Sequence, residues 1–493
     1  MSALSDTNAH RIDSIVAAAH QAAATWAAWP RSRRARTLRA VADRLESHAD
    51  HLVAIAMRES HLTEPRLRSE LARTTFQLRL FADVVDEGDY LDVRIDHADA
   101  HWPMGVRPDL RRTRVPYGAV VVFAASNFPF AFSVAGGDTA SALAAGCSVI
   151  LKAHPGHPDL SAATAETVCA ALADDRCPDG LFQVVYGDAA GRAALSHPLV
   201  KAGAFTGSIT GGRALFDLAA ARPEPIPFYA ELGSVNPVFV TPTADAERGA
   251  DVAAQLIDSV TLGAGQFCTK PGVVFAPESS NLLAALSQAD LPAPAPMLNA
   301  RIAHGYQLGL RSLRDHDRVR AVASGTDPAA PAVLVTDVAA LRDDPEALLA
   351  ECFGPAVLVV EYTAESQLLE VAEALPGQLT ATLVADEDDS VVPELLRILG
   401  GKVGRLLWNQ WPTGVSVTYA QQHGGPYPAT TAPGTTSVGT AAIDRFTRPL
   451  TYQGFPSGLL PDEVRDDPGV PARVDGRLVA GPRAGQAGVV GQP

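Results

Sequence analysis

The sequence predicts an α/β protein with two domains, each built around a doubly wound parallel sheet. Over most of the chain, short apolar runs alternate with loops and helix-compatible segments, which is typical of strands buried on both faces of a parallel sheet. The 493 residues are enough for several domain-sized units. In such folds ligands bind at the carboxyl ends of the strands, so the loops that follow the predicted strands should carry the chemistry.

The N-terminal part of the chain is predicted to be helical. Residues 1–90 are rich in Ala, Arg, Leu and Glu, and apolar positions such as Leu38, Val41 and Leu45 recur at helical spacing. We expect these helices to pack outside a sheet. Residues 115–137 carry no charge and are long enough to span a membrane, but Pro and Gly interrupt them and their start is a β-branched run. That run predicts a buried strand instead.

Two series of apolar runs define the predicted sheets. The first sheet takes its strands from residues 119–126, 148–154, 182–187 and 202–208. The same alternation returns after residue 236, with strands predicted at 237–240, 272–277 and 356–362. From about Asp467 onward Gly and Pro become too frequent for a packed core, so we expect a surface-draped or partly disordered tail.

Composition excludes several classes of protein. Lys and Arg number 40 and Asp and Glu 55, a net charge of −15, which argues against a nucleic-acid partner because phosphates require a basic face. The sequence has an odd number of cysteines and no CxxC motif, so we expect reduced thiols and no metal site. The five cysteines are Cys147, Cys169, Cys177, Cys268 and Cys352. No secretory signal is recognisable at the N-terminus, and the expected location is the cytoplasm.

Three residues could do covalent or proton-transfer chemistry. Cys268 lies in GAGQFCTKPG, a glycine-flanked segment where Lys270 would favour a thiolate, although a lone cysteine is more often a small buried hydrophobe. Glu231 sits in apolar surroundings that would raise its pKa for general-base work; a capping or surface role is the alternative. Asn127 follows the strand 119–126, and its amide could stabilise an oxyanion or simply shape a turn.

A glycine-rich turn points to a phosphate ligand. The segment FTGSITGGR, residues 205–213, ends a predicted strand and opens a helix, where backbone N–H groups and the helix dipole can approach a phosphate. It lacks the GxGxxG pattern. Lys152, near the end of the predicted strand 148–154, could bond a ribose hydroxyl or be solvated.

Taken in order, six motifs resemble those of the aldehyde dehydrogenase superfamily: FAASNFPFAFS, LKAHPGHP, FTGSITGGR, ELGSVNP, GQFCTKPG and ECFGPAV. The resemblance extends to about residue 456. A second set, which includes SELARTTFQLRLFAD, WPTGV, HGGPYPATT and TTSVGTAAIDRFTRPLTYQGFP, resembles the subgroup of α-ketoglutaric semialdehyde (2,5-dioxopentanoate) dehydrogenases. That subgroup is also similar to bacterial long-chain fatty aldehyde dehydrogenases.

The resemblance implies an NAD(P)+-dependent oxidation of an aldehyde to a carboxylic acid. Cys268 would attack the carbonyl, Asn127 and the Cys268 backbone N–H would hold the oxyanion, and Glu231 would activate the water that hydrolyses the thioester. The implied cofactor ligands are Lys152, His154, Gly207, Ser208, Gly233, Glu351 and Phe353. NAD-preferring members usually carry a glutamate where this chain has Pro155, so NADP is the expected preference, with NAD as the other candidate.

The substrate is predicted less directly. A dicarboxylate semialdehyde needs a cation for its distal carboxylate, and Arg73 with Gln77, on one predicted helix, are the candidates by analogy with substrate-tunnel helices in the family. Phe128, with Phe130 and Phe132, would instead suit an apolar tunnel for longer aldehydes. Ser126 stands where the common pattern has Trp, as the subgroup allows.

The resemblance also suggests a division of the chain. A dinucleotide-binding domain would comprise 1–97 and 117–235, a catalytic domain 236–440, an oligomerisation arm 98–116 and 441–456, and a tail 457–493. The arm implies a homodimer or homotetramer, because its strands would otherwise leave open sheet edges. Two other functions remain: a CoA-acylating or acyl-phosphate-reducing enzyme of the same fold, which typically lacks the base glutamate, and a catalytically silent structural or binding member.

Overall fold

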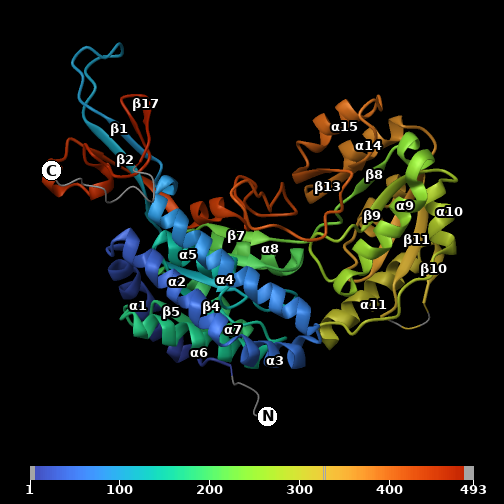
Figure 1. Cartoon of the computed structure of the whole chain (residues 1–493), viewed down its shortest axis with the longest axis horizontal. Helices are drawn as coiled ribbons and strands as arrows, with labels where there is room; N and C mark the ends of the chain where they lie inside the picture. Colours follow the sequence, from blue (N-terminus) through green and yellow to red (C-terminus); the bar gives the residue numbers. More distant parts are fainter. Residues whose placement is uncertain (1–5, 326, 328, 482–493) are drawn as a thin grey trace, which may run out of the picture.

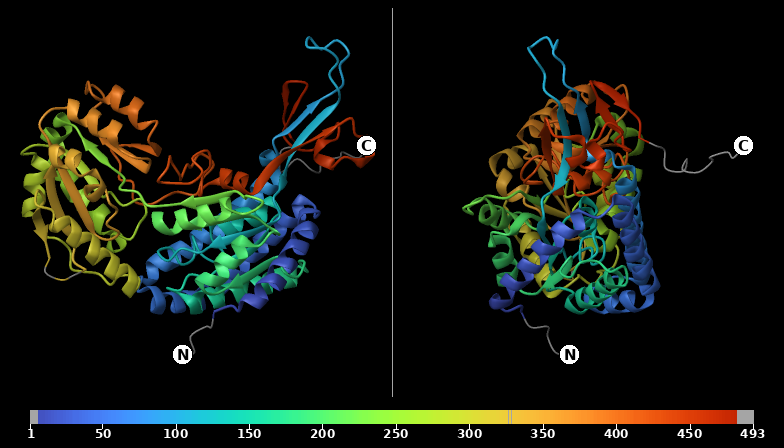
Figure 2. Two further views of the ribbon diagram at one scale, coloured as in Figure 1. Left: turned by 180° about the vertical axis from the view of Figure 1, so that it is seen from behind. Right: turned by 90° about the vertical axis from the view of Figure 1, so that its left-hand side faces the viewer.

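The fold was analysed in a computed structural model that describes residues 6–481, apart from 326 and 328. The chain forms two lobes, each with its own sheet, and a projecting arm (Figures 1 and 2). The predicted fold class, α/β with two parallel-sheet domains and an arm, is confirmed. Over the described part of the chain, no helix has the length and apolar character needed to cross a bilayer.

The first lobe surrounds a five-stranded parallel sheet with helices on both faces. The sheet order is β5-β4-β3-β6-β7, and its strands are β3 (Ala119–Phe123), β4 (Ser148–Lys152), β5 (Phe182–Val185), β6 (Val200–Thr206) and β7 (Phe228–Glu231). Every residue of β3 and β4 is buried, as expected for central parallel strands. The strand order reverses beside β3, and such a point is where doubly wound sheets bind ligands.

The helices of this lobe bury one apolar stripe each. Trp26, Leu38 and Leu45 are among the fully buried side chains that join the helices to the sheet. The helices are α1 (Ala9–Ala27), α2 (Arg31–Ser47), α3 (Ala49–Ser60), α4 (Glu64–Glu87), α5 (Gly137–Ala145), α6 (Pro158–Asp174), α7 (Asp188–Ser196) and α8 (Ile209–Ala220).

The second lobe holds a seven-stranded sheet in the order β10-β11-β12-β9-β8-β13-β14, parallel except for the edge strand β10. Its strands are β8 (Val238–Val240), β9 (Val273–Pro277), β10 (Arg320–Ser324), β11 (Ala332–Asp337), β12 (Ala356–Tyr362), β13 (Gln378–Val384) and β14 (Val403–Trp408). Its helices are α9 (Pro242–Thr261), α10 (Asn281–Gln288), α11 (Ala300–Arg314), α12 (Val338–Asp343), α13 (Pro345–Leu348), α14 (Ser366–Ala374) and α15 (Val392–Leu399). Two apolar clusters, one on each face, form its core.

The arm is a five-stranded sheet that differs from the prediction in two respects. Its order is β15-β2-β1-β16-β17, from β1 (Val93–Asp96), β2 (Leu110–Pro116), β15 (Thr447–Gln453), β16 (Ala472–Val474) and β17 (Arg477–Val479). β1 therefore pairs within the arm, although its residues were assigned to the dinucleotide-binding domain. The residues from 467 onward were expected to form a surface-draped or partly disordered tail, but β16 pairs with β1 and β17 pairs with β16, so residues 472–474 and 477–479 belong to this sheet. Residues 482–493 of the predicted tail lie outside the described residues.

One long segment without helix or strand connects the lobes. Residues 409–439 follow β14 of the second lobe and run back along β7 of the first, where Thr430 forms a β-bridge with Glu231 (Figure 1). The chain then enters the 3-10 turn η3 (Thr440–Phe446) and the arm. The other short 3-10 turns are η1 (Asp89–Leu91), η2 (Leu262–Gly265), η4 (Ser457–Leu459) and η5 (Asp462–Val464).

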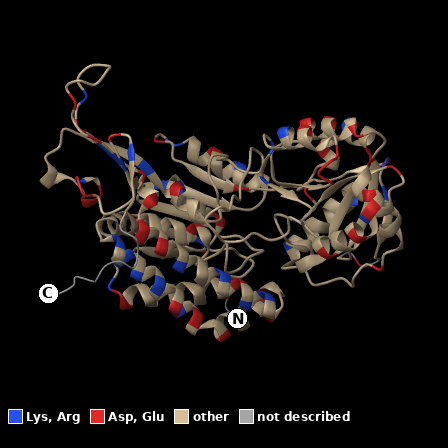
Figure 3. Ribbon diagram, turned by 45° about the horizontal axis from the view of Figure 1, so that its top comes forward, with Lys and Arg blue, Asp and Glu red and all other residues tan. Residues whose placement is uncertain are grey.

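Charged residues concentrate on the outer helices and on the arm, and the strands of the two lobe sheets carry few of them (Figure 3). Arg445 and Asp138 are an exception, because they form a buried ion pair of 2.6 Å between η3 and the first turn of α5. Arg445 Nε also donates to the Ala442 carbonyl. This pair fixes the end of the connecting segment to the first lobe.

Replacing Arg445 with Ala should destabilise the first lobe. The substitution leaves the Asp138 carboxylate buried without its counter-ion, which costs about 3 to 5 kcal/mol. Arg397→Ala is the control, because its ion pair with Glu394 is exposed and such pairs contribute about 1 kcal/mol or less. Urea denaturation followed by circular dichroism measures both, and equal effects of the two variants would contradict the role of the buried pair.

Candidate active site

Three reactive side chains from distant parts of the chain meet where the two lobes face each other. Cys268 lies in the loop before β9, Glu231 ends β7, and His423 comes from the connecting segment 409–439. The Cys268 Sγ is 3.6 Å from His423 Nε2, and that nitrogen is 2.8 Å from Glu231 Oε1. Glu231 and His423 are 3% and 1% exposed, so bulk water does not screen the pair.

The surroundings set opposite protonation states for the carboxyl and the thiol. Burial alone would raise the pKa of Glu231, but the imidazole of His423 and the hydrogen bonds from His423, Ser437 and Cys268 hold that pKa below its ordinary value. Burial, reinforced by the neighbouring Glu231 charge, raises the pKa of Cys268 well above its ordinary value. The expectation of a raised Glu231 pKa is therefore wrong, because sequence neighbours do not include the partners that stabilise the anion.

The connecting segment also fixes the orientation of the carboxylate. Ser437 Oγ donates to Glu231 Oε2 at 2.6 Å, so this oxygen is held and Oε1 is left facing His423. His423 is itself fixed through its backbone N–H, which donates to Thr436 Oγ1. Glu231 Oε1 and His423 Nδ1 form no well-aligned hydrogen bond with any other described residue.

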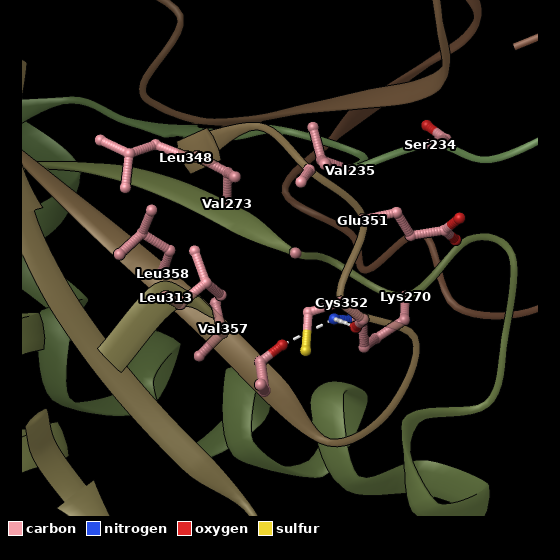
Figure 4. A pocket seen from close by; sticks show the side chains of 13 residues that line it. Ser234, Val235, Lys270, Val273, Leu313, Leu348, Glu351, Cys352, Val357 and Leu358 are labelled. Carbon is pink, nitrogen blue, oxygen red and sulfur yellow. Dashed lines mark hydrogen bonds between the residues drawn. The ribbon is translucent and has the colours of Figure 1, made fainter. Parts of the chain in front are cut away.

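Lys270 does not assist the thiol. Its Nζ donates to the carbonyls of Ala356 at 2.6 Å and Cys352 at 3.3 Å, in the small pocket beside Glu351 (Figure 4). The expected stabilisation of a Cys268 thiolate by this lysine is absent, because the ammonium is used to cap buried backbone carbonyls. Glu351 lies in the same pocket, where burial raises its pKa to about 7 and the charge of Lys270 opposes the rise.

Asn127 lies opposite the Cys268 loop. Its Nδ2 donates to the carbonyl of Gln266, two residues before the cysteine, at 3.2 Å. Glu70 of α4 anchors the loop that carries Asn127, because its Oε1 accepts hydrogen bonds from the backbone N–H groups of Phe130 and Ala131. A buried acid on a helix therefore positions this loop.

Helix α4 also brings Arg73 toward the thiol. The Arg73 guanidinium lies over the ring of Phe132, 5.3 Å from its centroid, and its charge interacts with Cys268 and Glu231. Burial lowers the pKa of Arg73, and no described residue forms a hydrogen bond or ion pair with its guanidinium. Its neighbour Arg66 instead lies 3.6 Å from Glu70.

The other predicted substrate residues have different surroundings. Gln77 is buried against Gly137 at the start of α5, with its Nε2 lacking a partner among the described residues. Phe128 packs edge-on against Phe132 and Phe267, beside Arg66. Phe130 is 1% exposed and packs in the core of the first lobe. It therefore behaves as an ordinary core residue.

The predicted ribose end of the site contains charges that the sequence did not reveal. Lys152 Nζ is 2.5 Å from Asp188 Oδ1, and this ion pair lowers the pKa of Asp188. Burial and the nearby His157, Lys152 and Arg301 lower the pKa of His154 to about 3, so His154 is neutral at physiological pH. His154 Nδ1 accepts from the Gly156 N–H, which leaves the ring proton on Nε2.

The glycine-rich turn has the geometry of an anion-binding helix start. Ser208 is the N-cap of α8 and its Oγ accepts from the Gly211 N–H, so its own proton is free to donate outward. Gly207 and Ser208 are both exposed. Gly233 lies against Glu351, where a Cβ would stand 2.4 Å from Glu351 Oε2, and Phe353 is half-buried near the same loop.

Sequence reasoning missed His423, Ser437 and Glu70. His423 lies in HGGPYPATT, a motif noted only for its resemblance, and nothing local to it indicates that it pairs with a carboxylate almost two hundred residues earlier. Glu70 looks like an ordinary helical glutamate. Asp188 and Arg301 were missed for the same reason, because their contacts are long-range.

Comparison with known proteins gives one family. The model described as "Aldehyde dehydrogenase family" matches residues 1–289. The chain is 42% identical to "Alpha-ketoglutaric semialdehyde dehydrogenase" of Acinetobacter baylyi, over 95% of this chain and 91% of that protein. It is 47% identical to "Alpha-ketoglutaric semialdehyde dehydrogenase 2" of Azospirillum brasilense, over 89% of this chain and 86% of that protein.

Solved structures give the same fold. The 1-pyrroline-5-carboxylate dehydrogenase from Thermus with bound NAD superposes with a TM-score of 0.77 at 21% sequence identity. The match covers 91% of this chain and 86% of that one. At this identity the likeness establishes the architecture, and the site must be judged from its own residues.

Removing the Glu70 carboxylate should loosen the Asn127 loop. In Glu70→Ala the Phe130 and Ala131 N–H groups stay buried without an acceptor, at a cost of about 1 to 3 kcal/mol each. Hydrogen exchange at these two amides should accelerate, and the urea midpoint should fall. The matched control is Glu64→Ala on the same helix, whose ion pair with Arg68 is exposed; unchanged exchange in Glu70→Ala would refute the positioning role.

Proposed function

Since the chain belongs to the aldehyde dehydrogenase family, we propose that it oxidises 2,5-dioxopentanoate, the semialdehyde of 2-oxoglutarate, to 2-oxoglutarate. The general activity is that of an aldehyde-oxidising oxidoreductase that uses a nicotinamide cofactor. The observation that carries the choice of substrate is the Arg73 guanidinium, whose charge interacts with Cys268 and Glu231 and which has no hydrogen-bond or ion-pair partner among the described residues, together with two relatives named for this activity.

The first half of the reaction starts at Cys268. Its thiol proton passes to the Glu231 carboxylate, which already interacts with the sulfur, and the thiolate forms a C–S bond to the aldehyde carbon. Asn127 then turns its amide from the Gln266 carbonyl to the developing oxyanion, an interaction typically worth about 3 kcal/mol. A nicotinamide bound beside Gly233 would supply the hydride acceptor for this oxidation, while Cys268 holds the substrate carbon as a thioester.

The second half depends on the buried pair of Glu231 and His423. After the thiol proton has passed from Glu231 to solvent, His423 favours the ionised carboxylate, which can then take a proton from water as the water oxygen attacks the thioester carbon. The C–S bond breaks, Cys268 recovers a proton and the acid leaves. Glu231 and Cys268 are the catalytic residues of this scheme, and Ser437 acts through Glu231 as a positioning residue.

Residues of both lobes fit a dinucleotide. Ser208, beside Gly207, presents its backbone N–H and a free hydroxyl proton for the pyrophosphate, and Glu351 with Phe353, from the loop before β12 of the second lobe, would hold the nicotinamide ribose beside Gly233. With a pKa of about 7, Glu351 is partly ionised near neutrality and can then accept from ribose hydroxyls. These residues bind and orient the cofactor, which itself supplies the redox chemistry.

NADP is the proposed preference, for a reason different from the one the sequence suggested. Because Pro155 stands where NAD-preferring members have a glutamate, no carboxylate at that position repels a 2′-phosphate. His154 is neutral, however, and does not attract the phosphate by its charge. Lys152 and Arg301 supply the positive charge instead. Asp188 is bonded to Lys152 but its side chain is 79% exposed, so its carboxylate can turn to solvent when a phosphate takes its place.

Two features support assembly with further copies of the chain. The tip of the β1–β2 hairpin carries the exposed side chains Trp102, Met104 and Val106, and it extends away from both lobes (Figure 2). The edge strands β14, β15 and β17 have unpaired backbone groups along one side. A homodimer or homotetramer is proposed, in the cytoplasm, where the five free cysteines would remain reduced.

The assay that tests this function combines 2,5-dioxopentanoate with NADP+ or NAD+ and no CoA. We expect stoichiometric 2-oxoglutarate and reduced cofactor, a higher kcat/KM with NADP+, and no turnover by Cys268→Ala. Strict dependence on CoA would favour an acylating enzyme, and wild-type rates equal to Cys268→Ala across an aldehyde panel would favour a silent member. An NAD+ value equal to or above that for NADP+ would overturn only the cofactor preference.

Replacing Arg73 should impair acidic substrates selectively. Loss of a charge-assisted hydrogen bond worth about 1.5 to 3 kcal/mol should raise KM for 2,5-dioxopentanoate about 10- to 150-fold in Arg73→Leu. Hexanal, which has no carboxylate, should be oxidised as before. Arg79→Leu on the outer face of the same helix is the control, since its guanidinium pairs with surface Asp43 and Glu46. A higher KM for both aldehydes alike would instead favour the apolar-tunnel alternative for longer aldehydes.

A further inference from the structure

We propose that Cys268, His423 and Glu231 also form a binding site for a zinc ion, which would reversibly inhibit the enzyme. No CxxC or His-x-x-x-His spacing marks this site in the sequence. The three side chains come from the loop before β9, from the connecting segment and from the end of β7. The inference rests on their geometry and does not depend on which aldehyde is oxidised.

The ligand atoms have nearly the separations that a tetrahedral ion requires. Cys Sγ, His Nε2 and Glu Oε1 lie within 4.8 Å of one another. Bonds of about 2.0 to 2.3 Å at tetrahedral angles place ligand atoms about 3.3 to 3.6 Å apart. The sulfur-to-nitrogen distance of 3.6 Å already fits, and the nitrogen-to-oxygen distance of 2.8 Å must open by a few tenths of an ångström.

The donor set and its charge also suit zinc. Thiolate, imidazole and carboxylate are its three common protein ligands, and three such ligands with one open position are typical of accessible zinc sites. The thiolate and the carboxylate together carry two negative charges, so the bound ion would be neutralised within a buried site. Glu231 Oε1 and the His423 ring point at this position and are almost completely buried.

Other features limit the affinity and explain why inhibition would be reversible. The guanidinium groups of Arg73 and Arg405 are close enough for their charges to interact with the sulfur, and they oppose a cation. The nearby Glu351 carboxyl, when ionised, offsets part of this positive charge. His423 Nδ1 has no acceptor among the described residues, whereas metal-bound imidazoles usually donate from this nitrogen. A chelator should therefore remove the ion.

Zinc binding would block both halves of the reaction. The thiol proton of Cys268 would leave to solvent as the S–Zn bond forms, and the proton of His423 that faces Glu231 would leave Nε2, so that the neutral ring bound to zinc carries its one proton on Nδ1. The sulfur lone pair is then unavailable for the aldehyde carbon. Glu231 is simultaneously occupied as a ligand and can no longer accept a proton from water. No electron transfer is involved, so removal of the ion restores the starting state.

The test is zinc titration of the full chain by calorimetry, without substrate. We expect one ion per chain, bound at least about tenfold more weakly by His423→Gln and by Cys268→Ser. Cys169→Ser, which removes a thiol on the outer face of α6, is the control and should bind as the wild type does. Unchanged binding by His423→Gln would mean that zinc attaches to the thiol alone and would overturn the proposal, as would unchanged binding by Cys268→Ser.

A second measurement uses the unmodified protein and is independent of how the variants fold. Cobalt(II) in place of zinc should give a thiolate charge-transfer band in the near ultraviolet and the intense visible bands of a tetrahedral ion. EDTA should abolish both bands and restore any aldehyde oxidation lost on metal addition. A weak octahedral spectrum without the thiolate band would overturn the proposal, whereas failure of the oxidation assay itself would bear only on the proposed function.

Discussion

A carboxylate buried at the end of a parallel strand must remain ionised, and the arrangement of the site follows from this requirement. Glu231 is 3% exposed, and burial by itself favours the neutral acid. The chain compensates with His423 on one oxygen and Ser437 on the other. Both come from the segment 409–439, so the ionised carboxylate is stabilised only when that segment has returned from the second lobe to the first.

The same requirement explains why this long segment has no regular structure. It must pass close to other backbones, and two glycines permit that approach. A Cβ on Gly404 of β14 would stand 2.2 Å from the Gly424 carbonyl oxygen, and Gly425 adopts φ of +150° next to the Gln378 carbonyl. A helix or strand could not follow this path while presenting His423 and Ser437 to one carboxylate. Pairing through the Thr430 bridge secures the segment to β7 instead.

The sequence was sufficient for the fold class because the signals of that class are local, although it did not predict the strands β7, β10, β11, β13 and β14. Uninterrupted apolar runs such as 119–123 identify buried parallel strands, and their alternation with helices determines the sheet class. Cys268 and Asn127 were singled out for the same reason, because their loops precede or follow predicted strands, whereas Glu231 ends β7, which was not predicted. The pKa of Glu231, the direction of Lys270 and the charge of His154 could not be predicted, since each depends on partners distant in sequence. The strands β16 and β17 were missed because three-residue strands in a Gly- and Pro-rich region have no period of their own.

The properties that suit Glu231 to the proposed role of a base would also make the site vulnerable to zinc. An effective arrangement needs a carboxylate that stays charged, an imidazole nitrogen beside it and a thiol that can lose its proton, all in a volume small enough to reach one carbonyl carbon. That description equally defines a three-ligand zinc site with an open position. Catalysis differs from metal binding only in which electrophile reaches the sulfur first. The positive charges of Arg73 and Arg405 can discriminate between the two, because they attract an anionic aldehyde and repel a divalent ion.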